Sequence, residues 1–203
     1  ITKHPFSIGF VGHADGSLSK WTKELLNFAK REVKRWQQNN TDYQAFYPSA
    51  VKRFVFLNQL NKIHQLQTNF IFRQKYRAGI ENKIYNKKNT EEEFKNNIRN
   101  NLFTFCMRGG GNFSVRFYET LAQGRIPFYL DTDTQLPLKE QIDWDKHIFT
   151  FTPQDSLQVI KEKFKNFIKH NDLEQVQVNN RLLWENRLTR EGYAKHLFFK
   201  YKM

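Results

Sequence analysis

The sequence predicts an α/β fold, a Rossmann-like parallel sheet with helices on both faces and a C-terminal helical tail. The first observation is a set of short apolar runs that are typical of buried strands, at residues 7–11, 68–72, 102–107, 126–130 and 147–151. The second is that segments with helical signals separate these runs, which predicts a parallel sheet covered on both faces. The third is the length of 203 residues, which suits one domain over 1–203, with 153–203 as a tail of two or three amphipathic helices packed on it.

Two helix starts carry clear capping signals. Ser17 can cap a helix whose apolar residues recur at helical spacing as far as Trp36. Thr90, with Glu93 three residues on, forms a capping box that predicts a helix over about 91–100. Both helices would connect strands of the predicted sheet.

Two further segments differ in how clearly they are specified. Residues 114–123 predict a helix, because Gly124 follows them as a helix-ending glycine. Residues 45–66 stay open, because their apolar side chains are spaced for a helix but the apolar run 54–56 could also form a strand.

Basic side chains dominate the composition. The formal net charge is +13 and the sequence pI is about 9.8. A surplus of this size favours an anionic partner, which could be nucleic acid, an anionic membrane surface, an acidic polysaccharide or a phosphorylated small molecule. A lysine-rich surface that is merely solvated is the alternative.

Cysteine usage and hydropathy exclude several classes of protein. Cys106 is the only cysteine, so an intramolecular disulfide and a zinc cluster of cysteines are excluded. No apolar run reaches the roughly 18 residues of a membrane-spanning helix, so we expect no transmembrane segment. We expect a cytoplasmic protein or one peripheral to a membrane surface, or one in the Golgi lumen if an anchor lies outside this chain. The start at Ile1 rather than Met points to a fragment or a processed product.

Residues 105–119, Phe-Cys-Met-Arg-Gly-Gly-Gly-Asn-Phe-Ser-Val-Arg-Phe-Tyr-Glu, form the most informative stretch. They predict a strand, a glycine loop and a helix start, at the edge where open parallel sheets bind ligands. A helix N-terminus suits phosphate, and the glycines at 109–111 let the backbone approach a ligand and adopt positive φ. Arg108 and Arg116 can neutralise a diphosphate, while Glu119 can accept hydrogen bonds from ribose hydroxyls.

The same stretch also has a purely structural interpretation. Arg116 and Glu119 are three residues apart, and a surface ion pair at that spacing contributes only about a few tenths of a kcal/mol. The loop matches neither the Gly-Lys-Ser/Thr of a Walker A motif nor the Gly-x-Gly-x-x-Gly of a dinucleotide site. Chemistry alone therefore leaves phosphate binding open.

Residues that follow the first two strands should reach the same edge of the sheet. His13 and Asp15 follow the first strand, where contact with a phosphate or sugar competes with ordinary turn chemistry and a solvated histidine. Arg73 and Arg77 follow the second strand and could bind a pyrophosphate or belong to a generic basic surface. We interpret the Asp-x-Asp at 131–133 as a loop, and the scattered histidines lack metal-ligand spacing, so we predict no metal site.

The stretch 105–130 resembles the signature block of exostosin-like glycosyltransferases. As in that family, a Phe-Cys strand leads to Arg-Gly, then come a Ser-x-Arg-x-x-Glu helix and a Gly-x-x-Pro strand. Other segments also look like family elements, namely residues 8–12, 68–73, 136–137 (Leu-Pro) and 142–144 (Ile-Asp-Trp). The resemblance covers roughly 7–151 and is most specific over 105–144. For Asp143 and Trp144 we favour structural roles, as a backbone cap and a packed ring.

This resemblance implies the second domain of a two-domain GT-B glycosyltransferase, so the chain would be one half of that fold. Such a domain binds the nucleotide-sugar donor, usually without a metal or other cofactor, and the family inverts the anomeric centre. By motif match Glu119 would hold the ribose, and the arginines would stabilise the diphosphate leaving group. The sequence singles out no catalytic base. The complete predicted donor site consists of His13, Arg73, Arg77, Arg108, Gly109, Gly110, Asn112, Ser114, Arg116 and Glu119.

The implied partners are a nucleotide-sugar donor, a glycan acceptor and a second GT-B domain, and the basic surface favours an anionic glycan. There is no room for an acceptor domain before Ser7. We therefore expect that this domain is missing from the chain, that a separate chain supplies it, or that the protein is not an active transferase.

Two alternatives to a glycosyltransferase function stay open. One is a nucleic-acid-binding protein, which the charge motivates but no visible recognition module supports. The other is a non-catalytic interaction domain on the same fold.

Overall fold

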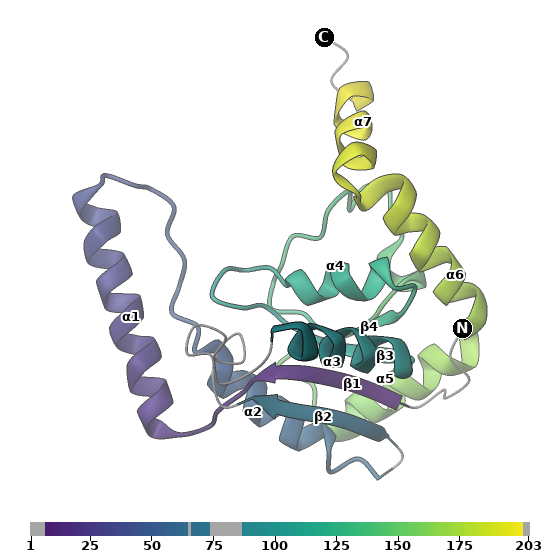
Figure 1. Ribbon diagram of the computed structural model, residues 1–203, viewed down its shortest axis with the longest axis horizontal. Helices are drawn as coiled ribbons and strands as arrows, with labels where there is room; N and C mark the ends of the chain where they lie inside the picture. Colours follow the sequence, from purple (N-terminus) through teal and green to yellow (C-terminus); the bar gives the residue numbers. More distant parts are fainter. Residues whose placement is uncertain (1–6, 65, 74–86, 201–203) are drawn as a thin grey trace.

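A five-stranded, wholly parallel sheet lies at the centre of the structure, a computed structural model that describes residues 7–64, 66–73 and 87–200 (Figure 1). The strand order is β2-β1-β3-β4-β5, and every neighbouring pair is parallel. The predicted α/β fold class is therefore confirmed. The strands are β1 (Ser7–His13), β2 (Gln67–Arg73), β3 (Phe103–Cys106), β4 (Ile126–Leu130) and β5 (Phe149–Phe151).

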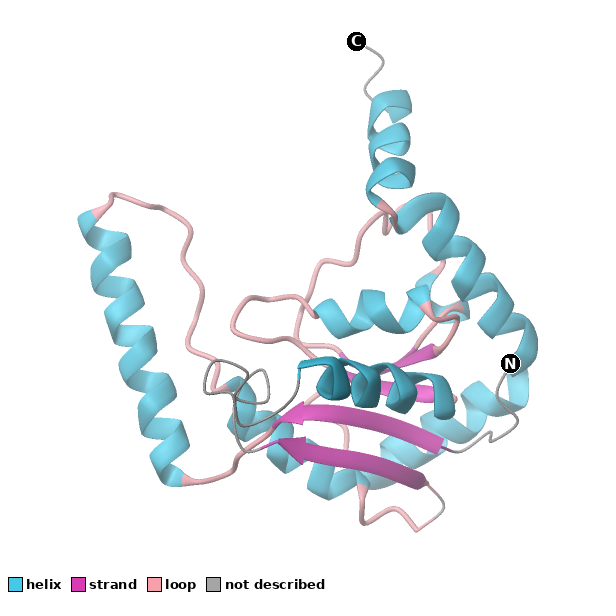
Figure 2. Cartoon of the chain, viewed as in Figure 1, coloured by secondary structure: helices cyan, strands magenta, loops and turns pink. Residues whose placement is uncertain are grey.

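Helices cover both faces of the sheet, as Figure 2 shows. Helices α2 and α5 lie on one face and α3 and α4 on the other (Figure 1). Helices α6 and α7 continue from the end of the sheet, while α1 stands apart from it. The helices are α1 (Leu18–Gln37), α2 (Ser49–Leu60), α3 (Lys87–Asn100), α4 (Val115–Ala122), α5 (Leu157–His170), α6 (Leu173–Leu183) and α7 (Arg190–Lys200).

Alternate residues along the central strands supply two separate apolar cores. Phe105 and Phe128 point to the face covered by α2 and α5 and join a cluster of aromatic and aliphatic side chains there. Their neighbours Cys106 and Tyr129 point to the opposite face and pack with Phe117 of α4. Because both faces are covered, β3 and β4 are buried along their whole length, which explains their continuous apolar sequences.

The structure settles the segment that the sequence left open. Residues 49–60 form helix α2, and Leu57 and Leu60 are almost fully buried against the sheet.

Two local predictions need correction. Helix α3 begins at Lys87, earlier than the capping box at Thr90 predicts. The expected backbone cap by Asp143 is wrong, since its side chain caps no backbone group and pairs with Lys146 at 3.0 Å.

Helix α1 does not pack on the sheet as its amphipathic sequence suggests. None of its residues is buried, and the ribbon stands clear of the strands (Figure 1). Its aromatic contacts are with the connection to α2, where the rings of Trp21 and Phe28 lie 5.8 and 5.4 Å from that of Phe46. The base of this arm is tied to α2, because Ala50 N donates to Glu24 Oε1 at 3.2 Å.

The helical tail is joined to the sheet by a buried polar network. Asn180 of α6 is fully buried, and its Nδ2 donates to the carbonyl oxygens of Arg125 and His147 at 3.0 and 2.9 Å. Its Oδ1 lies 2.8 Å from His147 Nδ1, so that ring nitrogen is the donor. Trp144 packs beside this network, with its Nε1 donating to Pro137 O at 3.1 Å, as its predicted structural role requires.

Within the described part of the chain, no helix combines the length and the hydropathy that crossing a bilayer requires.

We predict that Asn180→Ala lowers the free energy of unfolding by about 2–3 kcal/mol, because it leaves two buried carbonyls and one imidazole nitrogen without partners. Urea denaturation measures this change. Asn179→Ala is the matched control, because Asn179 is exposed on the same helix, and it should cost less than about 0.5 kcal/mol. Equal losses in the two variants would contradict a structural role for the network.

Candidate functional site

The strand order places a crevice between β1 and β3. From β1 the chain moves to β2 on one side and then to β3 on the other side, so the order reverses at β1. In open α/β sheets, ligands bind outside the carboxyl ends of the strands at such a reversal. A pocket of about 590 Å³ lies there, lined by the ends of β1 and β2, the glycine loop 109–111, and the first turns of α3 and α4. Its volume is in the range of sites that hold small molecules.

The glycine loop leaves open space on the pocket side. A Cβ atom added at Gly109 or Gly110 would meet no heavy atom within 4 Å. The expectation that these glycines adopt positive φ is wrong, since Gly124 is the one described glycine with a φ in that region, at 63°. The fold therefore does not demand glycine at 109 and 110, and their lack of a side chain serves to keep the pocket open.

Arg116, in the first turn of α4, reaches across the crevice to β1. Its Nη2 donates to the carbonyl oxygen of Val11 at 2.6 Å. Its guanidinium carbon lies 4.3 Å from the centre of the Phe10 ring, a distance typical of cation–π contacts. Its Nε is buried without a hydrogen-bond partner among the described residues. Burial lowers the pKa of this guanidinium, and the nearby positive charge of Arg73 lowers it further, while Glu119 acts in the opposite direction.

Gly12 provides the space that the Arg116 side chain occupies. A Cβ atom at position 12 would lie 2.8 Å from Arg116 Nη2 and 3.1 Å from Phe10 Cζ. Gly12 therefore has a role in the site through its missing side chain, because it lets the guanidinium lie flat at the end of β1.

Glu119 lines the same pocket one turn further along α4. It is half-buried, and burial raises the pKa of its carboxyl, while the positive charge of Arg116 opposes that shift. The two side chains form no direct ion pair among the contacts of the described residues. The surface ion pair that sequence spacing suggested is thus not formed, and both groups face the pocket.

His13 and Arg73 meet at the rim of the pocket, because they are register partners at the ends of β1 and β2. His13 Nδ1 lies 3.0 Å from the carbonyl oxygen of Arg73 and must carry the proton there, which leaves Nε2 as an acceptor in the neutral ring. Arg73 Nη2 donates to Thr90 O at 2.8 Å and pairs with Glu93 at 2.7 Å, so much of its charge is already compensated.

Two of the predicted residues point away from this pocket. Arg108 is 9% exposed and its guanidinium carbon lies 4.6 Å from the centre of the Tyr47 ring, on the other side of the glycine loop. Burial lowers its pKa, and its Nε has no hydrogen-bond partner among the described residues. Asn112 is engaged with the loop after β4, where its Nδ2 donates to Asp133 O at 3.0 Å and its Oδ1 accepts from Thr134 Oγ1 at 3.1 Å.

The remaining predicted residues are Ser114 and Arg77. Ser114 is the N-cap residue of α4 and lines the pocket, but its hydroxyl makes no capping hydrogen bond, so the oxygen can contact a ligand. Arg77 lies outside the described residues.

Asp15 accepts a hydrogen bond from Ser17 N at 2.9 Å, and this bond lowers the pKa of its carboxyl. Asp15 therefore has the ordinary turn role that the sequence offered as the alternative to a role in the site.

Sequence reasoning missed several residues of the pocket, among them Gly12, Arg53 and Phe94. Arg53 of α2 lines it and donates from Nη1 to His13 O at 2.7 Å. Phe94 of α3 forms part of the wall. Arg53 was missed because the sequence did not decide between helix and strand for residues 45–66. Helix α2 begins at the carboxyl edge of the sheet, so its first turns reach the pocket.

The neighbouring Cys106 offers no nucleophile. It is fully buried, and burial raises the pKa of its thiol to about 12. Its Sγ donates to Thr104 O at 3.3 Å. In the part of the chain that the structure describes, no group of three or more His, Cys, Asp and Glu side chains is arranged to hold a metal ion. The groups that the pocket presents are the guanidinium groups of Arg53, Arg73 and Arg116, the carboxyls of Glu91 and Glu119, the imidazole of His13 and the first amides of α4.

We predict that the pKa of Glu119 lies above its ordinary value of 4.5 and rises further in Arg116→Met, because that variant removes the opposing positive charge. A carboxyl that keeps its proton in the folded state makes the protein lose stability as pH rises from the ordinary pKa through the raised one. Carboxyl carbon shifts in an NMR titration measure the pKa. Lys62→Met is the control, because Lys62 follows α2 at the opposite edge of the sheet and should leave the titration unchanged. A pKa below 4.5 in the wild-type chain would contradict the burial of this carboxyl.

Comparisons with known proteins leave the site to be interpreted from its own geometry. No model of a known protein family matches the chain, and no curated protein matches it either.

Proposed function

We propose that this chain binds the diphosphate of a nucleotide-sugar donor and is the donor-binding domain of an inverting glycosyltransferase. The observation that carries the proposal is the Arg116 guanidinium, which is partly buried beside the pocket and has only neutral groups as direct partners. Withdrawing a cation partly from water without a carboxylate partner costs free energy, and an anionic ligand offsets that cost. The resemblance of residues 105–144 to exostosin-like glycosyltransferases supports the same conclusion.

The pocket offers a complementary group for each part of such a donor. The first amides of α4 and the positive end of its dipole suit a phosphate. Gly109 and Gly110 leave room for the diphosphate to approach the backbone. Glu119, one turn into the helix, can accept hydrogen bonds from the two ribose hydroxyls. Phe94 in the pocket wall offers an apolar surface for the base.

The catalytic part of the proposal follows from the charge that develops on the donor. In a direct displacement the bond between the anomeric carbon and the phosphate oxygen breaks, and its electron pair stays on the leaving nucleoside diphosphate. An acceptor hydroxyl forms the new bond and loses its proton to a base. Arg116, Arg53 and the start of α4 would face the leaving group and stabilise its added negative charge. The base and the acceptor site would come from the second domain.

We predict that Arg116→Met weakens binding of a nucleoside diphosphate by about 10- to 100-fold, because it removes charge-assisted hydrogen bonds to phosphate. Glu119→Gln should weaken binding by about tenfold, with a larger effect on nucleosides than on inorganic pyrophosphate. Isothermal calorimetry with UDP, GDP, ADP and pyrophosphate measures both effects. Lys62→Met is the control at the opposite edge of the sheet. If none of the four ligands binds the wild-type chain, the donor-site proposal fails.

We predict that Gly110→Val reduces nucleoside diphosphate affinity by at least about tenfold while the free energy of unfolding changes by less than about 1 kcal/mol. The new side chain enters open pocket space, where no protein atom lies within 4 Å of its Cβ. Calorimetry and urea denaturation on the same preparation separate the two effects. Gly124→Val is the contrasting variant and should lose stability, because Gly124 has a φ of 63° and a Cβ atom there would lie 3.1 Å from Gln177 O. Unchanged affinity in Gly110→Val would place the ligand away from the loop.

A further inference from the structure

Helix α1 presents an apolar stripe that the described residues of the chain leave uncovered. None of its residues is buried. The exposed fractions are 77% for Leu18, 60% for Leu26, 57% for Val33 and 79% for Trp36. Large apolar side chains exposed together along one element mark an interaction surface.

The stripe has two flanks, and only one of them is used. At 3.6 residues per turn, Leu18 and Trp36 lie at the same angle around the helix axis, with Leu26 and Val33 on one side of them and Trp21 and Phe28 on the other. Trp21 and Phe28 pack against Phe46. The flank with Leu26 and Val33 faces away from that contact. The helix is therefore attached through one flank and free along the other.

The face away from the stripe is strongly basic. Helix α1 carries six basic and two acidic side chains, a net charge of +4. Lys23, Lys30 and Lys34 form one line about 140° around the axis from Leu18 and Trp36. The acidic Glu32 is already paired with Arg35 at 2.7 Å. The lysines therefore have no acidic stripe on their own helix to neutralise them.

We propose that α1 is a docking arm for an anionic lipid surface, with Leu18, Leu26, Val33 and Trp36 among the acyl chains and the lysines at the headgroups. Helices with a basic polar face and a Trp- and Leu-rich apolar face bind in the plane of the membrane interface. The arm stands clear of the sheet, so its free flank can reach a flat surface without steric hindrance from the body (Figure 1). Anionic headgroups supply the charge complementarity that the helix requires.

Other occupants of the stripe fit less well. A second copy of the chain would bring two helices of net charge +4 together, and like charges oppose such pairing. Nucleic acid would engage the lysines but would leave the exposed Leu and Trp side chains in water. The lipid surface uses both faces of the helix. This proposal is independent of the donor site, which lies at the ends of the strands.

Vesicle sedimentation of the full chain tests the proposal. The chain should pellet with phosphatidylcholine vesicles that contain about 30% phosphatidylserine and should bind pure phosphatidylcholine vesicles at least about tenfold more weakly. The double variant Leu26→Ser, Trp36→Ser should bind the anionic vesicles at least about tenfold more weakly than wild type. The charge variant Lys23→Gln, Lys30→Gln, Lys34→Gln should show a similar loss. Because these side chains are exposed, circular dichroism should be unchanged.

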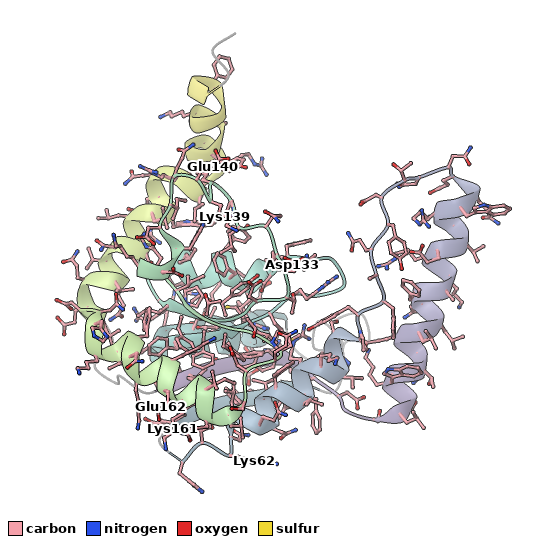
Figure 3. All side chains as sticks on the ribbon, turned by 180° about the vertical axis from the view of Figure 1, so that it is seen from behind. Lys62, Asp133, Lys139, Glu140, Lys161 and Glu162 are labelled. Carbon is pink, nitrogen blue, oxygen red and sulfur yellow. The ribbon has the colours of Figure 1, made fainter. Side chains whose placement is uncertain are left out.

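A matched control separates the arm from the overall basic charge. The variant Lys161→Gln, Lys165→Gln, Lys169→Gln removes an equal number of positive charges, three, from α5. Figure 3 shows Lys161 on the side of the body away from the arm. It should keep its affinity for anionic vesicles within about threefold. An equal loss in this control, or wild-type affinity in both arm variants, overturns the proposal. So does a lipid-free dimer that the Leu26→Ser, Trp36→Ser variant dissociates in sedimentation equilibrium, since a second copy would then cover the stripe.

Discussion

The contact of Arg116 with the end of β1 organises the pocket. The Arg116 guanidinium of α4 lies on the Phe10 ring and donates to Val11 O, so the start of α4 is held against β1. Strand β1 is where the strand order of the sheet reverses. Gly12 makes this possible by lacking a side chain. The same contact fixes the direction of the first amides of α4 and places a positive charge where water has limited access. The shape of the pocket and its electrostatic preference therefore share one cause.

The arginine charges around the pocket are compensated unequally by neighbouring groups, and this difference decides which arginine attracts a ligand most strongly. Arg73 is paired with Glu93 and bound to a carbonyl, so it mainly joins α3 to β2. Arg116 contacts neutral groups only, and Arg108 stacks on Tyr47 beyond the loop. A ligand that enters the pocket therefore gains most from meeting Arg116. Glu119, with its pKa raised by burial, lies near enough to influence that charge without cancelling it.

The sequence predicted the fold class and the strands well, because a parallel sheet covered on both faces requires continuous apolar runs that are easy to recognise. It also predicted that Arg116, Glu119, Ser114 and His13 lie at one edge, since strand ends and helix starts meet there. It could not predict that Arg108 turns to Tyr47, because both sides of a loop are equally accessible to a long side chain. Arg53 was missed because residues 45–66 carry both helical and strand-like signals. The exposed position of α1 could not be predicted, because an amphipathic pattern does not show which surface its apolar face contacts.

The α1 arm leaves the body near the rim of the pocket, and the chain that follows it returns to the same region. The helix begins at Leu18, shortly after β1 ends at His13, and the chain returns to the first turn of α2. There Asp15 N donates to Ala50 O at 3.3 Å, and Glu24 accepts from Ala50 N. The segment that follows His13 is therefore the link between the arm and the sheet, and it lies beside the first turn of α2.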